Sequence, residues 1–171
     1  MKSYSNKGFS YIELLLVISI MTLMVGFTAI GIGTVNRNNV NRTADKVYAS
    51  INSGRSSSLT NGTSNGWCNF TVKNGNLYSY CGPRITNVST SAFNSTNWEK
   101  VCTKAIKLKY GSHTLAEGEV LSLNFKQSTG EYIGYKTKTS TNYTTGNLTI
   151  TLTNGNKSKN LIINKFGKIT E

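Results

Sequence analysis

The sequence predicts an α+β fold in which one long N-terminal helix, with a transmembrane half and an amphipathic half, packs on an antiparallel β-sheet domain. Three observations lead to this prediction. Residues 14–35 carry no ionisable side chain, apolar residues then recur at helical spacing, and beyond residue 61 the apolar period changes from 3.6 to 2. One long helix followed by a meander of strands is typical of the α+β class.

The first segment, residues 9–33, is predicted to be a transmembrane helix. Its uncharged run from 14 to 33 has 20 residues, which at about 1.5 Å per residue crosses a hydrocarbon core of roughly 30 Å. Lys2 and Lys7 keep the short polar N-terminus in the cytoplasm by the positive-inside rule. No small-residue cleavage site follows the run, unlike an ordinary secretory signal. Glu13 stands alone at its start, where a carboxylate is usually functional and paired; the alternative is a signal anchor whose glutamate reaches the headgroups.

Residues 34–60 are predicted to be the amphipathic half of the same helix. Four apolar residues follow one another at steps of four, three and four, as on one helical face: Val40, Ala44, Val47 and Ile51. The helix is expected to run from about residue 9 to about residue 59, a length of roughly 75 Å. The Asn-Gly pair at 61–62 ends it. The alternative is a break at Gly31 and Gly33 that gives two helices.

The strongest strand signal is a β-hairpin around Asn74-Gly75, because Asn-Gly is the preferred two-residue type I′ turn. With that loop, paired positions sum to 74 + 75 = 149, which places Cys68 opposite Cys81. The pair falls on a non-hydrogen-bonded site, where opposed Cα atoms are closest. Three cysteines allow three pairings, and this register favours a Cys68–Cys81 disulfide. Cys102 is left over, buried at the start of a later strand.

Residues 61–171 are predicted to form the antiparallel β globular domain. Strands are expected at residues 67–73, 76–81, 102–110, 120–126, 132–137, 148–153 and 161–164. The segment 82–98 reads as an irregular loop, and a short strand at 84–88 is an open alternative.

The formal net charge of +12 over 171 residues points to acidic partners. A surplus of this size attracts nucleic acid and acidic cell-surface polymers through counterion release. The best candidate patch is Lys104, Lys107 and Lys109, of which the last two share one side of a predicted strand. The alternative is that the lysines simply solvate the domain.

Catalytic patterns are absent from the sequence. The single histidine, His113, has no Ser–Asp setting or metal-ligand spacing around it, the acidic residues are scattered, and no glycine-rich phosphate loop occurs. We therefore predict that the protein is not an enzyme, and we expect no metal and no cofactor. Two functions remain, a structural assembly protein and a binding module on the same scaffold.

The N-terminus resembles the class III signal of type IV prepilins and pseudopilins: a short basic leader, Gly8, the aromatic Phe9, three residues, Glu13 and then the apolar helix. The resemblance implies that residues 1–8 are a leader peptide, which prepilin peptidase removes between Gly8 and Phe9 before it methylates the new amino group. It also implies that residues 9–33 form the filament core after assembly. There Glu13 is expected to neutralise the α-amino group of a neighbouring subunit, since pairing recovers much of the cost of burying each charge alone. Many pilins carry a proline within this helix, and this chain has none there.

The implied function is a type IV pilin-like subunit, a minor pilin or pseudopilin, of a pilus or of a secretion or competence pseudopilus. The implied partners are other pilin or pseudopilin subunits, prepilin peptidase and the inner-membrane assembly platform. The implied location is a single-pass cell-membrane protein before assembly and an extracellular pilus or pseudopilus afterwards.

A looser resemblance, to the GspH/FimT group of minor pilins and pseudopilins, covers the globular part. Members of this group carry an arginine–serine pair late in the helix, here Arg55-Ser56, and close with a strand, a glycine, a basic residue and an aliphatic, here around Gly167. Some relatives bind DNA through basic residues near the closing glycine, which correspond to Lys165 and Lys168. The alternative function is therefore a DNA- or surface-binding minor pilin.

Overall fold

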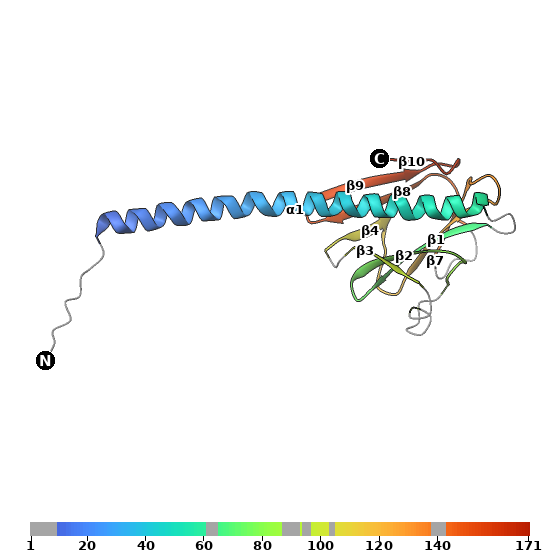
Figure 1. Cartoon of the computed structure of the whole chain (residues 1–171), viewed down its shortest axis with the longest axis horizontal. Helices are drawn as coiled ribbons and strands as arrows, with labels where there is room; N and C mark the ends of the chain where they lie inside the picture. The colour runs from blue at the N-terminus through green and yellow to red at the C-terminus, as the bar shows by residue number, and fades with distance from the viewer. Residues whose placement is uncertain (1–9, 61–64, 87–92, 94–96, 103–104, 138–142) are drawn as a thin grey trace. The chain divides into compact units, whose positions relative to one another are not determined.

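The computed structural model describes residues 10–60, 65–86, 93, 97–102, 105–137 and 143–171, and within the helix it leaves the side chains of residues 27–33 undescribed (Figure 1). The chain divides into two units, Met1–Val35 and Asn36–Glu171. The described part of the first unit is helical from Tyr11 onward. The second unit contains the remainder of that helix and the ten described strands.

Helix α1 spans Tyr11–Thr60, close to the predicted 9–59. In the second unit, the four predicted stripe residues form its buried face and are each at most 2% exposed: Val40, Ala44, Val47 and Ile51. The predicted amphipathic stripe is therefore confirmed. Gly54 continues this face, and a Cβ at that position would lie only 2.9 Å from the Cβ of Cys68. The absence of a side chain at residue 54 thus lets α1 pack closely on the sheet.

The predicted fold class is wrong in giving this helix a transmembrane half. In the described part of the chain, no helix combines the length and apolar character needed to cross a membrane.

The strands of the second unit are antiparallel, and they form two sheets, a division that was not predicted from the sequence. The first, with strand order β3-β2-β1-β6-β7, contains β1 (Gly66–Lys73), β2 (Asn76–Cys81), β3 (Glu99–Cys102), β6 (Val120–Phe125) and β7 (Tyr132–Thr137). The second, with order β10-β9-β8-β4-β5, contains β4 (Lys107–Tyr110), β5 (His113–Thr114), β8 (Leu148–Asn154), β9 (Lys157–Ile163) and β10 (Ile169–Thr170).

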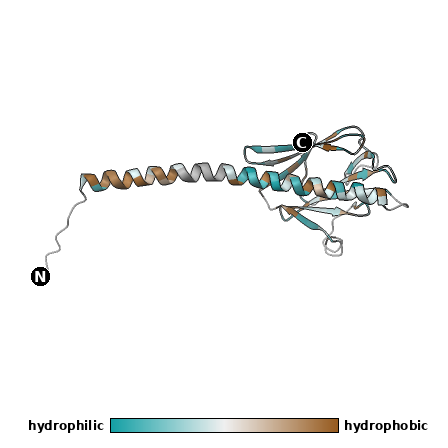
Figure 2. Ribbon diagram, turned by 45° about the horizontal axis from the view of Figure 1, so that its top comes forward, coloured by the Kyte–Doolittle hydropathy of each residue, from teal (hydrophilic) through white to brown (hydrophobic). Residues whose placement is uncertain are grey.

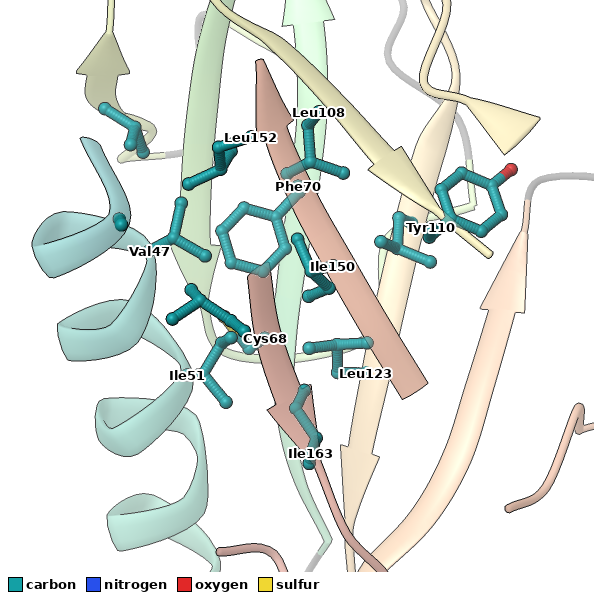
Figure 3. Packing of buried hydrophobic residues seen from close by; sticks show 14 of the residues in the cluster. Val47, Ile51, Cys68, Phe70, Leu108, Tyr110, Leu123, Ile150, Leu152 and Ile163 are labelled. Atoms are coloured by element: carbon teal, nitrogen blue, oxygen red, sulfur yellow. The ribbon is translucent and has the colours of Figure 1, made fainter. Parts of the chain in front are cut away.

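The core of the second unit lies where both sheets meet the buried face of α1 (Figure 3). Val47 and Ile51 of the helix point toward Phe70 of β1 and toward residues of the second sheet such as Leu152. These side chains are all at most 1% exposed. Neither sheet alone encloses this core, so the helix and both sheets are stabilised together by the burial of apolar surface.

The β1–β2 hairpin has the predicted turn and register. Asn74 and Gly75 adopt φ angles of 52° and 70°, as a type I′ turn requires, and the strands pair Val72 with Leu77 and Cys68 with Cys81. This part of the sequence prediction is confirmed.

Two strand predictions need correction. The strand expected at 102–110 is two strands, β3 and β4, which belong to different sheets, so Cys102 ends a strand instead of starting one. The strand expected at 161–164 begins earlier, at Lys157, because a turn at Gly155 folds it back along the whole of β8. Of the short strand suggested at 84–88, residues 84–86 are irregular and the remainder lie outside the described residues.

Candidate functional sites

The first part of α1 exposes apolar side chains on every side. Twelve large apolar side chains between residues 11 and 25 are 44–78% exposed: Tyr11, Ile12, Leu14, Leu15, Leu16, Val17, Ile18, Ile20, Met21, Leu23, Met24 and Val25. Figure 2 shows this stretch as the most hydrophobic part of the helix. A helix that is apolar all round is normally covered by protein or lipid. The segment is therefore a candidate contact surface.

Glu13 lies in the first turn of α1, where its carboxylate caps the N-terminus of the same helix. The backbone N–H of Ser10 donates a hydrogen bond to Glu13 Oε2 at 2.9 Å. A serine followed three residues later by glutamate is the capping-box pattern, and a carboxylate there also interacts favourably with the helix dipole. The sequence analysis missed this role, although Ser10-Tyr11-Ile12-Glu13 carries the pattern. The predicted processing residues Gly8 and Phe9 lie outside the described residues.

The lysines of β4 alternate with buried residues as predicted. Lys107 and Lys109 are exposed, while Leu108 and Tyr110 are 1% and 6% exposed. Threonines stand opposite the lysines on β8, so the outer side of this sheet is polar. The third predicted member of the patch, Lys104, lies outside the described residues.

Lys165 and Lys168 lie in the turn between β9 and β10. The side-chain oxygen of Asn164 accepts hydrogen bonds from the backbone N–H groups of Phe166 and Lys168, each at 3.0 Å, and so shapes this turn. Both lysine side chains are exposed. Strands β8 and β9 separate them from the β4 lysines, so the structure does not bring the two predicted lysine groups into one site.

Arg55 joins the end of α1 to two glycine turns. Its Nε donates a hydrogen bond to the carbonyl oxygen of Gly130 at 3.2 Å. A Cβ at Gly167 would collide with that same oxygen and would lie 3.1 Å from Arg55 Nε. The late-helix arginine and the closing glycine, which the sequence analysis noted separately, thus belong to one contact, which we call the Arg55 clamp (Arg55, Gly130 and Gly167).

The predicted Cys68–Cys81 disulfide is not formed in this structure, where both residues are thiols with their sulfur atoms 3.8 Å apart. The strand register that led to the prediction is present. The bridge itself therefore stays a prediction. Cys102 is a buried thiol at the end of β3.

Clusters of potential metal-ligating or catalytic side chains are sparse in the described parts of the chain. Among those residues, no group of three or more His, Cys, Asp or Glu side chains is placed to hold a metal ion. His113 is not isolated, because its Nε2 lies 2.9 Å from Glu119 Oε2 at the protein surface. Sequence reasoning missed this pair.

Comparisons of the chain with protein-family models, curated proteins and solved structures find no match.

Proposed function

We propose that this chain is a type IV pilin-like subunit, a minor pilin or pseudopilin, which enters a pilus or a secretion or competence pseudopilus through the first part of α1. The observation that carries the proposal is the exposure of apolar side chains around the whole circumference of residues 11–25, with Glu13 as the charged residue of that segment. The proposal includes no catalytic role.

Packing against the same segment of neighbouring subunits would bury this surface. Each fully buried Val, Leu, Ile or Met side chain contributes roughly 1.5–3 kcal/mol, so a bundle of such helices gains a large driving force. In that apolar surrounding a carboxylate needs a partner, because a buried unpaired charge is strongly destabilising. A neighbour's α-amino group provides it. Ser10, whose N–H already binds Glu13, directly follows the proposed new N-terminus at Phe9.

The partners in this proposal are other pilin or pseudopilin subunits, prepilin peptidase and the inner-membrane assembly platform. The location belongs to the same proposal: the cell membrane before assembly and an extracellular filament afterwards.

The test separates the charge of Glu13 from its capping role. Glutamine also serves at this position of a capping box, so Glu13→Gln keeps the cap and removes the charge, whereas Glu13→Ala removes both. We expect both variants to reach normal cellular levels and to enter sheared filaments at least about tenfold less than the wild type, because each leaves a neighbour's amine unpaired. Immunoblots of cell and filament fractions measure this.

Asp45→Asn is the matched control, since it removes one exposed carboxylate from the second unit. It should enter filaments normally. Wild-type incorporation of Glu13→Gln together with a defect in Glu13→Ala would leave helix capping as the role of Glu13 and would contradict charge pairing.

The second candidate function is a DNA- or surface-binding minor pilin. The exposed pair Lys107 and Lys109, on the polar outer side of the second sheet, favours it. Its distinguishing property would be a salt-sensitive affinity for DNA or an acidic polymer that depends on these particular lysines.

A further inference from the structure

The thiols of Cys68 and Cys81 lie close together in different surroundings. Their sulfur atoms are 3.8 Å apart across the β1–β2 pair. Cys68 is completely buried beneath α1, where Gly54 packs on it, whereas Cys81 is partly exposed. Their Cα atoms are directly opposed on a non-hydrogen-bonded pair, where strands approach most closely. A bond between the two sulfur atoms therefore calls for side-chain rotation rather than strand movement.

Access from solvent also differs between the two thiols. Cys81 lines a cavity of about 560 Å³ together with Trp67 and Arg84. It also lines a second cavity, of about 480 Å³, whose walls include Ser53 and Tyr80. Cys68 is in the wall of neither cavity. A reagent that enters from solvent therefore meets Cys81 first.

The two thiols also differ in pKa: that of Cys81 is lowered and that of Cys68 is raised. The hydrogen bond from the Cys68 thiol lowers the pKa of Cys81 to about 7, and hydrogen bonds from the Ser53 side chain and the Gly54 backbone act in the same direction. Partial burial and the negative charge of Glu99 oppose them. The Ser50 carbonyl, 3.0 Å from the Cys81 sulfur, accepts a hydrogen bond from the protonated thiol and also opposes ionisation. Burial raises the pKa of Cys68 well above its usual value.

We propose that Cys81 and Cys68 form a thiol–disulfide exchange site, in which Cys81 attacks an external disulfide and Cys68 then displaces the oxidant. In the first step, the Cys81 thiolate bonds to one sulfur of the oxidant, and the other sulfur leaves as a thiolate. In the second step, Cys68 loses its proton and bonds to the Cys81 sulfur, so that the remaining half of the oxidant also leaves as a thiolate. The protein gains one disulfide, and the oxidant disulfide is reduced to two thiols.

This proposal is independent of the proposed filament function, because it concerns only the second unit. Its chemistry fixes the roles of the two cysteines: Cys81 is the attacking residue and Cys68 the resolving residue. Cys102, buried at the end of β3, takes no part.

The test uses full-length protein in mild detergent, with Cys102→Ala in every sample so that only the pair reacts. The reduced protein is mixed with the small disulfide 5,5′-dithiobis(2-nitrobenzoate). The pair should release two equivalents of thionitrobenzoate and end two hydrogens lighter by mass spectrometry, with no adduct. Cys68→Ser should release one equivalent at a similar rate and keep the adduct. Cys81→Ser should react at least about tenfold more slowly, since Cys68 is buried and protonated.

A pH series tests how Cys81 is activated. The rate of Cys68→Ser should rise with a midpoint near pH 7, because its hydroxyl still donates to the Cys81 sulfur, and Cys68→Ala should have a higher midpoint. In concentrated urea all single-thiol variants should react alike, which shows that the native difference requires the fold. Equal native rates for Cys68 and Cys81, or an adduct that persists on Cys81 when Cys68 is present, would overturn the proposal.

Discussion

One side chain near each end of α1 makes a hydrogen bond that fixes a contact of that end. Glu13 binds the N–H of Ser10 in the first turn, and Arg55 binds the carbonyl of Gly130 in the last part of the helix. The first contact leaves the carboxylate exposed, where a partner can reach it. The second ties the helix to a turn more than 70 residues away, which makes the Arg55 clamp a long-range stabilising contact within the second unit.

The Arg55 clamp predicts that residue 167 must be glycine. Gly167 has a φ of 73°, and a Cβ there would collide with the Gly130 carbonyl. We expect Gly167→Ala to lower the free energy of unfolding by about 3 kcal/mol, from backbone strain together with the collision. Urea unfolding followed by tryptophan fluorescence measures the change.

Gly111→Ala is the matched control for this variant. Gly111 also has a positive φ, of 57°, but nothing lies within 4 Å of a Cβ built on it. It should cost only about 1 kcal/mol, the strain of the left-handed conformation alone. Similar losses in the two variants would show that the clamp does not constrain residue 167.

At the level of elements, the tip of the β1–β2 hairpin is held by the segment that leads into β6, the other neighbour of β1. The carboxylate of Glu117 accepts hydrogen bonds from the backbone N–H groups of Asn74, at 2.5 Å, and Gly75, at 3.0 Å. Nearby, the N–H of Gly118 donates to the carbonyl of Val72 at 2.9 Å. The turn is thus fixed by contacts outside its own sequence as well as by its Asn-Gly pair.

Removing the Glu117 side chain should therefore loosen the hairpin. We expect Glu117→Ala to lower the free energy of unfolding by about 1 kcal/mol, since two charge-assisted hydrogen bonds at an exposed turn are lost. Glu117→Gln retains one acceptor oxygen and should lose about half as much. Hydrogen exchange of the β1–β2 amides, compared with those of β8–β9, should show the loss concentrated in the hairpin.

The control for Glu117→Ala is Glu131→Ala, which removes another exposed carboxylate. Glu131 forms an exposed ion pair with Lys126 at 3.4 Å. Glu131→Ala should change stability by less than about 0.5 kcal/mol. If Glu117→Ala changed stability no more than Glu131→Ala does, the Glu117 carboxylate would not be needed to hold the turn.

The sequence predicted those elements whose information is local. The stripe from Val40 to Ile51 and the Asn74-Gly75 turn each follow from residues close together in the chain. Strand β9 was predicted too short because its first half, Lys157-Ser158-Lys159-Asn160, is polar and forms only through pairing with β8. The division into two sheets was missed because no local sequence pattern shows that β3 and β4 belong to different sheets.

In the candidate sites, too, only features encoded by residues close together in the chain were predicted. The alternation of Lys107 and Lys109 with buried neighbours was predicted because it lies within one strand. The Arg55 clamp joins residues separated by as many as 112 positions, 167 − 55, and the Glu117 contact bridges more than 40. Such contacts depend on how the strands are arranged, which no spacing in the sequence reveals.

On the scale of the whole molecule, positive charge is spread over the described surface rather than gathered at one place. Lys107 and Lys109 lie on β4, and Lys165 and Lys168 lie beyond β9. Elsewhere lysines are partly neutralised, as where Lys159 Nζ lies 2.8 Å from Glu171 Oε2. The strands of the second sheet contain no arginine, the residue that grips phosphate with two parallel hydrogen bonds.

This distribution predicts weak, diffuse binding to DNA. Affinity should fall steeply as salt rises, because each neutralised phosphate of a duplex contributes about 0.9 to the slope of log affinity against log salt. Lys107→Gln with Lys109→Gln, and Lys165→Gln with Lys168→Gln, remove the same charge from two exposed places. We expect the two double variants to lose affinity equally and each to reduce the slope by at most about 2, as gel-shift titrations over a range of salt would measure. A loss several times larger for the β4 pair would contradict diffuse attraction and favour the binding function. A larger loss for the pair beyond β9 would instead place the binding site near the closing glycine, Gly167, because net charge changes by two in both variants and only the position differs.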